Sequence, residues 1–242
     1  MIHYVYGNGE SRKGFGVTRG NGVSWGCNAI YRDHNVDNLV AVDYGIQGEI
    51  IESGYAKTHN CWFSDWNLLP TTSEILLEEM LKGWKPEQVH YYGKDNGSMV
   101  VNGSGREKDR VKNELGLHVI YPSDSDLITP IIDPKEWGAG TTAVHLACQD
   151  IACNEVYMFG FDIANYSDGE RINNIYKGSK YYLPEEAEGR NPHDWRQQLY
   201  LTFREFSNVK FTWVNNDFKF IEKSRIKDCP NVKLETYDNI RL

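Results

Sequence analysis

The chain has 242 residues, of which 40% are hydrophobic and 13% aromatic, enough for one sizeable core and small for two domains. The formal net charge of −8 argues against broad nucleic-acid binding, because nucleic-acid binders present a basic face, although a nucleotide needs only a few donors. No run of about 18 apolar residues occurs, so no membrane span is expected. The first residues lack the basic-then-apolar pattern of a signal peptide. The sequence therefore predicts a soluble, cytoplasmic protein with no nucleic-acid partner.

The five cysteines form no Cys-x-x-Cys pair, and Cys148 and Cys153 have a poor spacing for a tetrahedral metal site. We expect reduced, buried cysteines that pack as small apolar side chains. No cluster of His, Cys, Asp or Glu has the spacing of metal ligands, and no Gly-x-Ser-x-Gly or Cys-His arrangement offers a hydrolase nucleophile. The sequence predicts neither a metal nor a cofactor.

Apolar runs alternate with helical patterns along the chain. Strands are predicted at His3–Tyr6, Ser24–Ile30, Asn38–Val42, Val89–Tyr92, Leu117–Tyr121, Glu155–Phe159 and Val209–Val214. Helices are predicted at Ser73–Lys82, at Arg106–Leu115, after Gly140 and from about Pro192 to Phe206. This alternation predicts an α/β, Rossmann-like fold with a mostly parallel sheet and helices on both faces, in a single domain over residues 1–242.

Two stretches interrupt this alternation. Asn96–Arg106 indicates a hairpin or loop inserted between core elements. Ile163–Gly189 is polar, tyrosine-rich and long for a connection, which is typical of an active-site lid or else of a disordered segment. We expect a lid-like insertion at about 163–189.

Residues 138–162 are the most informative part of the chain. A small, flexible turn leads into an apolar-striped helix and a buried strand, and the strand ends in a Gly-x-Asp that contains Asp162. Ligands of open α/β sheets bind at the carboxyl ends of the strands. The amide-rich start of the helix, with the hydroxyls of Thr141 and Thr142 beside it, suits a phosphate or a carboxylate.

The first predicted strand runs directly into Gly7-Asn8-Gly9-Glu10-Ser11. Gly7 and Gly9 let the backbone turn sharply and approach a ligand, while Asn8 and Ser11 offer hydrogen bonds. The motif is neither a Walker loop nor a full Gly-x-Gly-x-x-Gly, so a simple turn is the alternative. Two strand-to-loop exits of this kind predict a nucleotide-type ligand in a crevice between them.

Asn28 and Asp43 are further nucleotide-binding candidates. Asn28 places an amide in an otherwise apolar strand, where it must be hydrogen-bonded, either to a base or ribose or to neighbouring loops. Asp43 closes the third predicted strand, where it could contact a ribose hydroxyl or a metal, or else cap the next turn.

His193, Tyr166 and Tyr176 are the catalytic candidates. His193 begins a helix after the lid-like segment, where the helix dipole lowers the pKa of an imidazole and keeps it ready to act as a general base. The alternative is an exposed surface histidine. Tyr166 and Tyr176 could donate to a phosphate from the lid-like segment, or be ordinary loop tyrosines.

The motifs together resemble those of a known family. Gly7-Asn8-Gly9-x-Ser11, Cys27-Asn28-x-x-Tyr31, the small-residue turn with its helix, and Glu155-Val156-Tyr157-Met158-x-Gly160-x-Asp162 resemble, in this order, bacterial sialyltransferases of the Campylobacter type. The same skeleton is similar to the Rossmann-like group that includes archaeal 6-hydroxymethylpterin diphosphokinases. The chain as a whole resembles uncharacterised proteins of marine cyanobacterial viruses, which would place it in the host cytoplasm.

The resemblance to sialyltransferases implies an inverting, metal-independent glycosyltransferase that uses a nucleotide-activated sugar. It implies that Asn8, Gly9 and Asn28 hold the nucleotide and that the Thr141-Thr142 turn contacts the phosphate or sugar of the donor. The family has an arginine and a serine before this helix, where this chain has Glu136-Trp137-Gly138-Ala139-Gly140. The base, the sugar, the acceptor and a homo-oligomeric state are therefore open.

The same resemblance implies the catalytic roles. Tyr166 and Tyr176 correspond to the tyrosines that bind the departing phosphate, and His193 corresponds to the general base. Two other functions are open: a pyrophosphokinase in which Asp43 and Asp162 hold Mg²⁺ against a nucleoside triphosphate, or a non-catalytic viral accessory or binding protein.

Overall fold

The computed structural model describes residues 1–17, 20–63, 67–68, 89–92, 99–103, 117–121, 126–132, 135, 137–164, 166–167 and 169–240. The chain divides into two compact units. The first unit is Met1–Val40 with Trp137–Leu242, and the second unit is Ala41–Glu136. The boundary falls inside one strand, so the expectation of a single domain stays a prediction. The helices expected at Ser73–Lys82 and Arg106–Leu115 lie outside the described residues.

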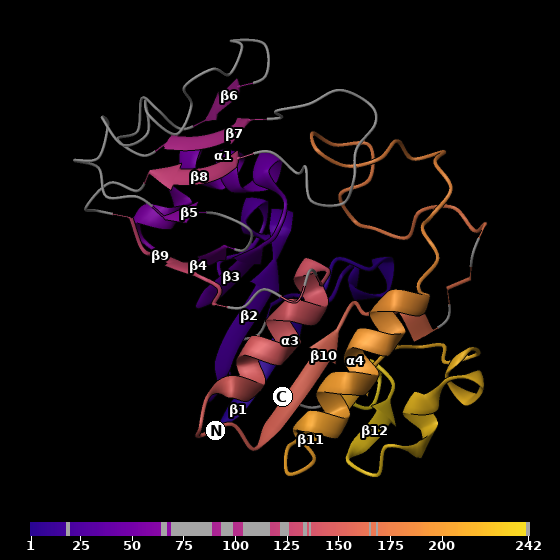
Figure 1. Cartoon of the computed structure of the whole chain (residues 1–242). Coiled ribbons are helices and arrows are strands. Elements are labelled where there is room, and N and C mark those ends of the chain that lie inside the picture. The colour runs from indigo at the N-terminus through magenta and orange to yellow at the C-terminus, as the bar shows by residue number, and fades with distance from the viewer. Residues whose placement is uncertain are drawn as a thin grey trace. The chain divides into compact units, whose positions relative to one another are not determined.

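The first unit is built on a parallel sheet with the strand order β12-β11-β10-β1-β2-β3 (Figure 1). Its strands are β1 (Ile2–Tyr6), β2 (Val23–Cys27), β3 (Asn38–Ala41), β10 (Glu155–Phe159), β11 (Lys210–Val214) and β12 (Val232–Glu235). The sequence pattern predicted all of these except β12, which carries few apolar residues. β2 is shorter than expected, because residues Asn28–Arg32 turn into a 3₁₀-helix, η2.

Two α-helices, α3 (Ala139–Gln149) and α4 (His193–Glu205), lie side by side over this sheet (Figure 1). α3 contacts β1, β2 and β10. The apolar positions Val144 and Ala147 of α3 and Leu199 and Phe203 of α4 are fully buried, as the helical spacing predicts. Ile151 lies beyond the end of α3 and is fully exposed. The fold is thus α/β and Rossmann-like, with a parallel sheet and packed helices.

Aromatic side chains pack against one another in the core of the first unit. Phe203 of α4 lies with its ring centroid 4.6 Å from that of Phe211 in β11. Tyr6 and Phe159, which are paired across β1 and β10, stack with their centroids 5.1 Å apart. All five cysteines are buried and free, as their composition and spacing indicated.

The second unit contains a helix and strands that pair both in parallel and antiparallel. Its elements are α1 (Tyr44–Glu52), β4 (Asn60–Phe63), β5 (Asn67–Leu68), β6 (Val89–Tyr92), β7 (Met99–Gly103), β8 (Leu117–Tyr121) and β9 (Ile128–Pro130). β4 pairs with β9 in parallel. β7 lies antiparallel to both β6 and β8, so the stretch Asn96–Arg106 contains a hairpin strand. No helix in the described part of the chain is long and apolar enough to cross a membrane.

A histidine is buried in β1 of the first unit. His3 is 1% exposed, its Nδ1 accepts a hydrogen bond from Nε1 of Trp25 (2.9 Å), and its Nε2 lies 3.3 Å from Oδ2 of Asp150 without hydrogen-bond geometry. Burial lowers the pKa of His3 below the ordinary value of 6.5, and the Asp150 carboxylate only partly opposes this shift.

The lowered pKa of His3 predicts a pH-dependent stability. Below about pH 6.5 the His3 imidazole is protonated in the unfolded chain but stays neutral in the folded protein. The free energy of unfolding should therefore fall as the pH drops through this range. His3→Gln should flatten this dependence in urea unfolding between about pH 5 and pH 7. Lys223→Gln, at an exposed position, should keep the wild-type slope. Identical slopes in all three proteins would contradict the role of His3.

Candidate functional site

Two asparagines lie at the carboxyl ends of neighbouring strands in the first unit. Asn8 follows β1 and is 8% exposed, and its Nδ2 donates to the carbonyl of Cys27 at the end of β2 (3.0 Å). Asn28 follows β2 with a φ of 50°, a left-handed conformation that asparagine tolerates better than most residues. The structure therefore brings together two of the residues that the sequence predicted for nucleotide binding.

The segment Asn173–Tyr182, from the predicted lid, is bonded to these strand ends. Asn173 Oδ1 accepts from the backbone of Glu10 (2.8 Å), and Lys177 pairs with the Glu10 carboxylate (2.9 Å). Arg32, at the end of η2, donates to the Ser179 hydroxyl (2.8 Å). These bonds hold the segment against the rim of the sheet, and its opening as a lid stays a prediction.

Two tyrosines of this segment, Tyr176 and Tyr182, lie close to each other, and Tyr182 contacts Asn8. The hydroxyl of Tyr182 accepts from Asn8 Nδ2 (3.4 Å) and from the backbone of Ala29 (3.3 Å). The rings of Tyr176 and Tyr182 lie 5.8 Å apart, and the Arg32 guanidinium is 5.9 Å from each ring centroid. Burial raises the pKa of both phenols, so they act as neutral hydroxyls.

We call Asn8, Arg12, Asn28, Tyr176 and Tyr182 the polar cluster. Four of its buried atoms have no hydrogen-bond partner within the protein: Asn8 Oδ1, Arg12 Nη2, Asn28 Oδ1 and the Tyr176 hydroxyl. Leaving a buried polar group unsatisfied costs about 1–3 kcal/mol, and native proteins tolerate few such groups. The polar cluster is therefore equipped to bind a small polar ligand.

The glycines of the first loop serve a different purpose from the one that the sequence suggested. The backbone N–H groups of Gly7 and Gly9 donate to the carbonyls of Phe159 (2.7 Å) and Gly160 (2.9 Å). A Cβ at Gly7 or at Gly9 would lie 2.6 Å from the Gly160 oxygen. The glycines let the loops after β1 and β10 pack backbone to backbone, and their approach to a ligand stays a prediction.

Asp162 is the acceptor that joins these loops. It is 5% exposed, and its carboxylate accepts from the backbone N–H of Ser11 (2.8 Å), from the Ser11 hydroxyl and from Asn215 Nδ2 (3.1 Å). Ser11 also lies 3.2 Å from the hydroxyl of Tyr237, which accepts from the Gly160 backbone (3.0 Å). This arrangement favours a structural role for Asp162 and Ser11 over direct contact with a nucleotide.

The start of α3 lies on the same rim as Asn8. A Cβ at Gly140 would be 3.8 Å from Cys27 Sγ and 3.4 Å from the ring of Phe161, and the Cys27 carbonyl binds Asn8. The buried side chains of Cys27 and Phe161 occupy the space next to this turn. The turn and the Asn8 loop thus meet at one edge of the sheet, with packed side chains beside the turn.

The two threonines of this turn differ in their surroundings. Thr141 is 3% exposed, and its hydroxyl donates to the Gly138 carbonyl (2.9 Å) or to Gln198 Oε1 (2.5 Å) on α4. Thr142 is half-buried, and its backbone donates to Gly138 (2.9 Å). Thr141 joins the start of α3 to Gln198 of α4, while Thr142 is the more accessible to a ligand.

The catalytic candidates occupy separate positions. His193 is the exposed first residue of α4, and its backbone donates to Asn191 Oδ1 (2.9 Å). Tyr166 is 5% exposed and its hydroxyl donates to the Glu170 carbonyl (3.1 Å), so this phenol is already engaged. Tyr176 belongs to the polar cluster. Of the two predicted tyrosines, Tyr176 is the better placed to meet a ligand.

Asp43 belongs to the second unit. It is exposed and precedes α1, and its carbonyl accepts from the Gln47 backbone (3.0 Å). Its contact with a nucleotide stays a prediction. No group of three or more His, Cys, Asp or Glu side chains among the described residues is arranged to hold a metal ion.

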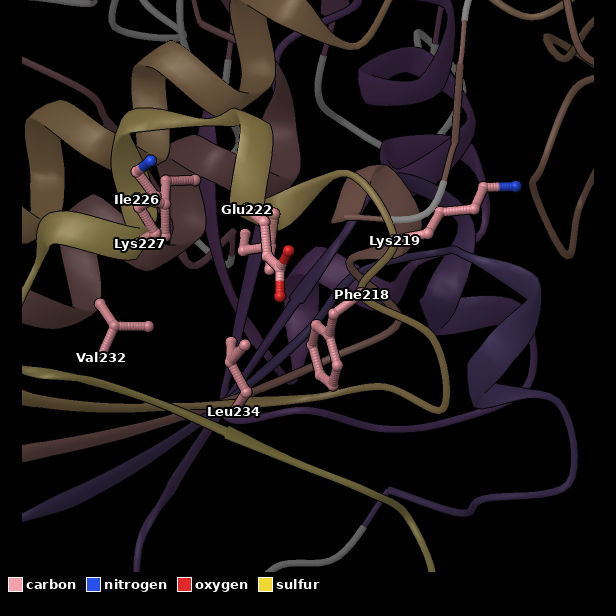
Figure 2. A pocket seen from close by; sticks show the side chains of 8 residues that line it. Phe218, Lys219, Glu222, Ile226, Lys227, Val232 and Leu234 are labelled. Carbon is pink, nitrogen blue, oxygen red and sulfur yellow. The ribbon is translucent and has the colours of Figure 1, made fainter.

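Among the described residues of the first unit, we consider two hollows. The larger, of about 500 Å³, lies at the edge strand β12 (Figure 2) and is lined by Phe218, Lys219, Ile221, Glu222, Ile226, Lys227, Val232 and Leu234. It contains no predicted site residue. The smaller, of about 250 Å³, is lined by Arg12, Lys13, Gly14, Phe15, Gly16, Asp33, His34 and Ile175. We call it the Arg12 hollow, and it adjoins the polar cluster through Arg12.

Sequence reasoning missed Arg12, Asp33 and the position of Tyr182. Arg12 follows the Gly7–Ser11 motif directly, which was the one available signal, but most arginines are exposed and nothing in the pattern marks this one as buried. Tyr182 was one tyrosine among several in the lid-like segment. Its contact with Asn8 joins positions 174 residues apart in the chain.

Comparisons of the chain with protein-family models, with curated proteins and with solved structures find no match. The residues of the site therefore carry the functional argument.

The close approach of Gly7 and Gly160 predicts a large effect of a single methyl group. Gly160 has a φ of +67°, and a Cβ there would lie 2.7 Å from the Gly7 oxygen. Gly160→Ala should lower the free energy of unfolding by about 3 kcal/mol or more, from conformational strain and steric overlap together. Gly169→Ala, at a φ of +79° with nothing within 4 Å, isolates the strain and should cost about 1 kcal/mol. Urea denaturation measures both, and equal losses would contradict the close contact.

Proposed function

We propose that this protein binds the nucleotide part of an activated sugar at the polar cluster and acts as an inverting, metal-independent glycosyltransferase. The observation that carries the proposal is the group of unpartnered buried polar atoms at the carboxyl ends of β1 and β2. Polar groups of this kind at the strand ends of a parallel sheet are typical of nucleotide sites.

The orientation of the amides supports a ligand that carries hydrogen-bond donors. Asn8 Nδ2 donates to the Cys27 carbonyl, which fixes Oδ1 of the same amide as an acceptor. Asn28 presents a second amide oxygen at the neighbouring strand end. The amino group of a nucleobase and the hydroxyls of a ribose are donors of the required kind. Nothing in the polar cluster selects one base.

The transfer chemistry needs a base for the acceptor and stabilisation of the leaving phosphate. His193 is exposed at the start of α4, where it is accessible to an acceptor hydroxyl. Tyr176 is a neutral phenol in the polar cluster and can donate to an oxyanion. Tyr166 would first have to release the Glu170 carbonyl.

The magnesium-dependent pyrophosphokinase receives less support from the residues present. It would use Asp162, whose oxygens already accept hydrogen bonds from Ser11 and Asn215. The net charge of −8 argues against a nucleic-acid substrate. We place the proposed activity in the cytoplasm.

Nucleotide binding is tested by thermal unfolding with CMP, UDP, GDP and ATP, each with and without Mg²⁺. A nucleotide at 100 times its Kd should add about 2.7 kcal/mol of stability, which corresponds to about 5–10 °C in Tm. Asn28→Gly removes the amide and suits the left-handed backbone, so it should keep the unliganded stability and weaken binding about 10-fold. Tyr181→Gly, at an exposed left-handed position, is the matched control and should bind normally.

If no nucleotide stabilises the wild-type protein, the proposal fails and a non-catalytic role is favoured. A strict requirement for Mg²⁺ would favour the pyrophosphokinase.

The role of His193 is tested with the activated sugar of whichever nucleotide binds. His193→Ala should lower kcat by about 10²-fold or more, because it removes the general base, and leave nucleotide affinity unchanged. Asp194→Ala, at the adjacent exposed position, should retain the wild-type kcat. Release of nucleotide from the activated sugar is the readout. Unchanged turnover in His193→Ala would remove the assignment of the base.

A further inference from the structure

We propose that Arg12 is an anion-binding residue and that the Arg12 hollow receives a phosphate group. The inference deepens the proposed function, because this phosphate would belong to the nucleotide held by the polar cluster. The evidence for this inference is that the Arg12 guanidinium is buried beside the Arg12 hollow.

Arg12 is buried to an unusual degree for a charged side chain. It is 3% exposed, and its Nε donates to the Gly7 carbonyl (2.9 Å). Its Nη2 is buried and has no hydrogen-bond partner in the protein. Buried charges in proteins are normally paired with an opposite charge. No ion pair formed within the described residues includes Arg12.

The surroundings of the guanidinium favour an anion. The Arg12 hollow has a volume of about 250 Å³, and Lys13 and His34 line it together with Arg12. Gly14 and Gly16 also line the hollow and have no side chains that would restrict access to it. A guanidinium with free N–H groups matches the oxygens of a phosphate, often in a bidentate manner.

Asp33 defines the ligand further. Its carboxylate lines the same hollow and, together with Arg12, faces the Tyr176 hydroxyl. A carboxylate repels a bare phosphate and accepts hydrogen bonds from hydroxyl groups. Arg12 and Asp33 together therefore suit a sugar phosphate, with the phosphate at Arg12 and a hydroxyl at Asp33.

A purely structural role of Arg12 makes the opposite prediction for stability. If Arg12 served only to hold the Gly7 loop, its replacement would destabilise the protein under all conditions. If Arg12 is kept for a ligand, an apolar side chain of similar length relieves an unpaired buried charge in the unliganded protein. Arg12→Met separates the two roles.

The experiment follows thermal unfolding of the full chain in inorganic phosphate and in ribose 5-phosphate, with sodium chloride at matched ionic strength. Both probes should raise the Tm of the wild-type protein in a saturable manner. Arg12→Met should lose at least 10-fold in affinity for both, with a Tm in sodium chloride equal to or above that of the wild type. Lys223→Met removes an exposed positive charge and should respond like the wild type. Asp33→Asn should bind inorganic phosphate more tightly than the wild type.

Several outcomes would overturn the inference. These are no stabilisation of the wild type by either probe, an equal response in Arg12→Met, or a large loss of stability of Arg12→Met in sodium chloride. If Arg12→Met does not fold, Arg12→Lys keeps the charge without the bidentate geometry, and an unchanged affinity in that variant would equally overturn it.

The result also separates this inference from the proposed function. Phosphate binding that depends on Arg12, in a protein that no nucleotide stabilises, would leave the anion site standing and remove the nucleotide. Nucleotide binding that is unchanged in Arg12→Met would support the nucleotide site and rule out the anion site at Arg12.

Discussion

The contact between the loops after β1 and β10 fixes the rest of the site. β1 and β10 are adjacent central strands, and the chain leaves them in opposite directions along the sheet, toward β2 and β11. In open α/β sheets this switch point is where loops diverge and ligands enter. Here Gly7 and Gly9 bond the carbonyls of Phe159 and Gly160, and Asp162 joins the same loops through Ser11. Side chains at the glycines would push the loops apart.

Backbone contacts close the switch point between β1 and β10. The polar groups that could bind a ligand lie instead between β1 and the next strand, β2. They lie at the ends of β1 and β2, where the segment Asn173–Tyr182 is hydrogen-bonded to the same loops. The two regions differ in how their polar groups are satisfied. Both oxygens of the Asp162 carboxylate have donors, whereas the amide oxygens of Asn8 and Asn28 have none. The hydrogen-bonded Asp162 carboxylate stabilises the fold. The unpartnered amide oxygens of Asn8 and Asn28 lower the stability and remain able to bind a ligand.

The sequence predicted the strands and helices of the first unit well, because a buried parallel sheet requires continuous apolar runs and packed helices require a 3.6-residue stripe. It also placed Asn8, Asn28 and Tyr176 among the candidates, and the structure places the two asparagines at neighbouring strand ends. The roles of Gly7 and Gly9 could not be read from the pattern, because a backbone that approaches a ligand and one that approaches another backbone need the same missing side chain. The burial of Arg12 depends on contacts distant in sequence, and such contacts have no local signature.

The balance of charges around Arg12 explains how the fold tolerates an unpaired buried cation. Its Nε retains one strong acceptor, the Gly7 carbonyl, so the guanidinium is held in place without a carboxylate against it. A carboxylate bonded to Arg12 would stabilise the unliganded protein and would compete with any incoming anion. Asp33 instead lies on the wall of the hollow, exposed and therefore screened by solvent. An arginine anchored through one nitrogen and without a hydrogen-bond partner at another is preorganised, so little conformational entropy remains to be lost when a phosphate binds.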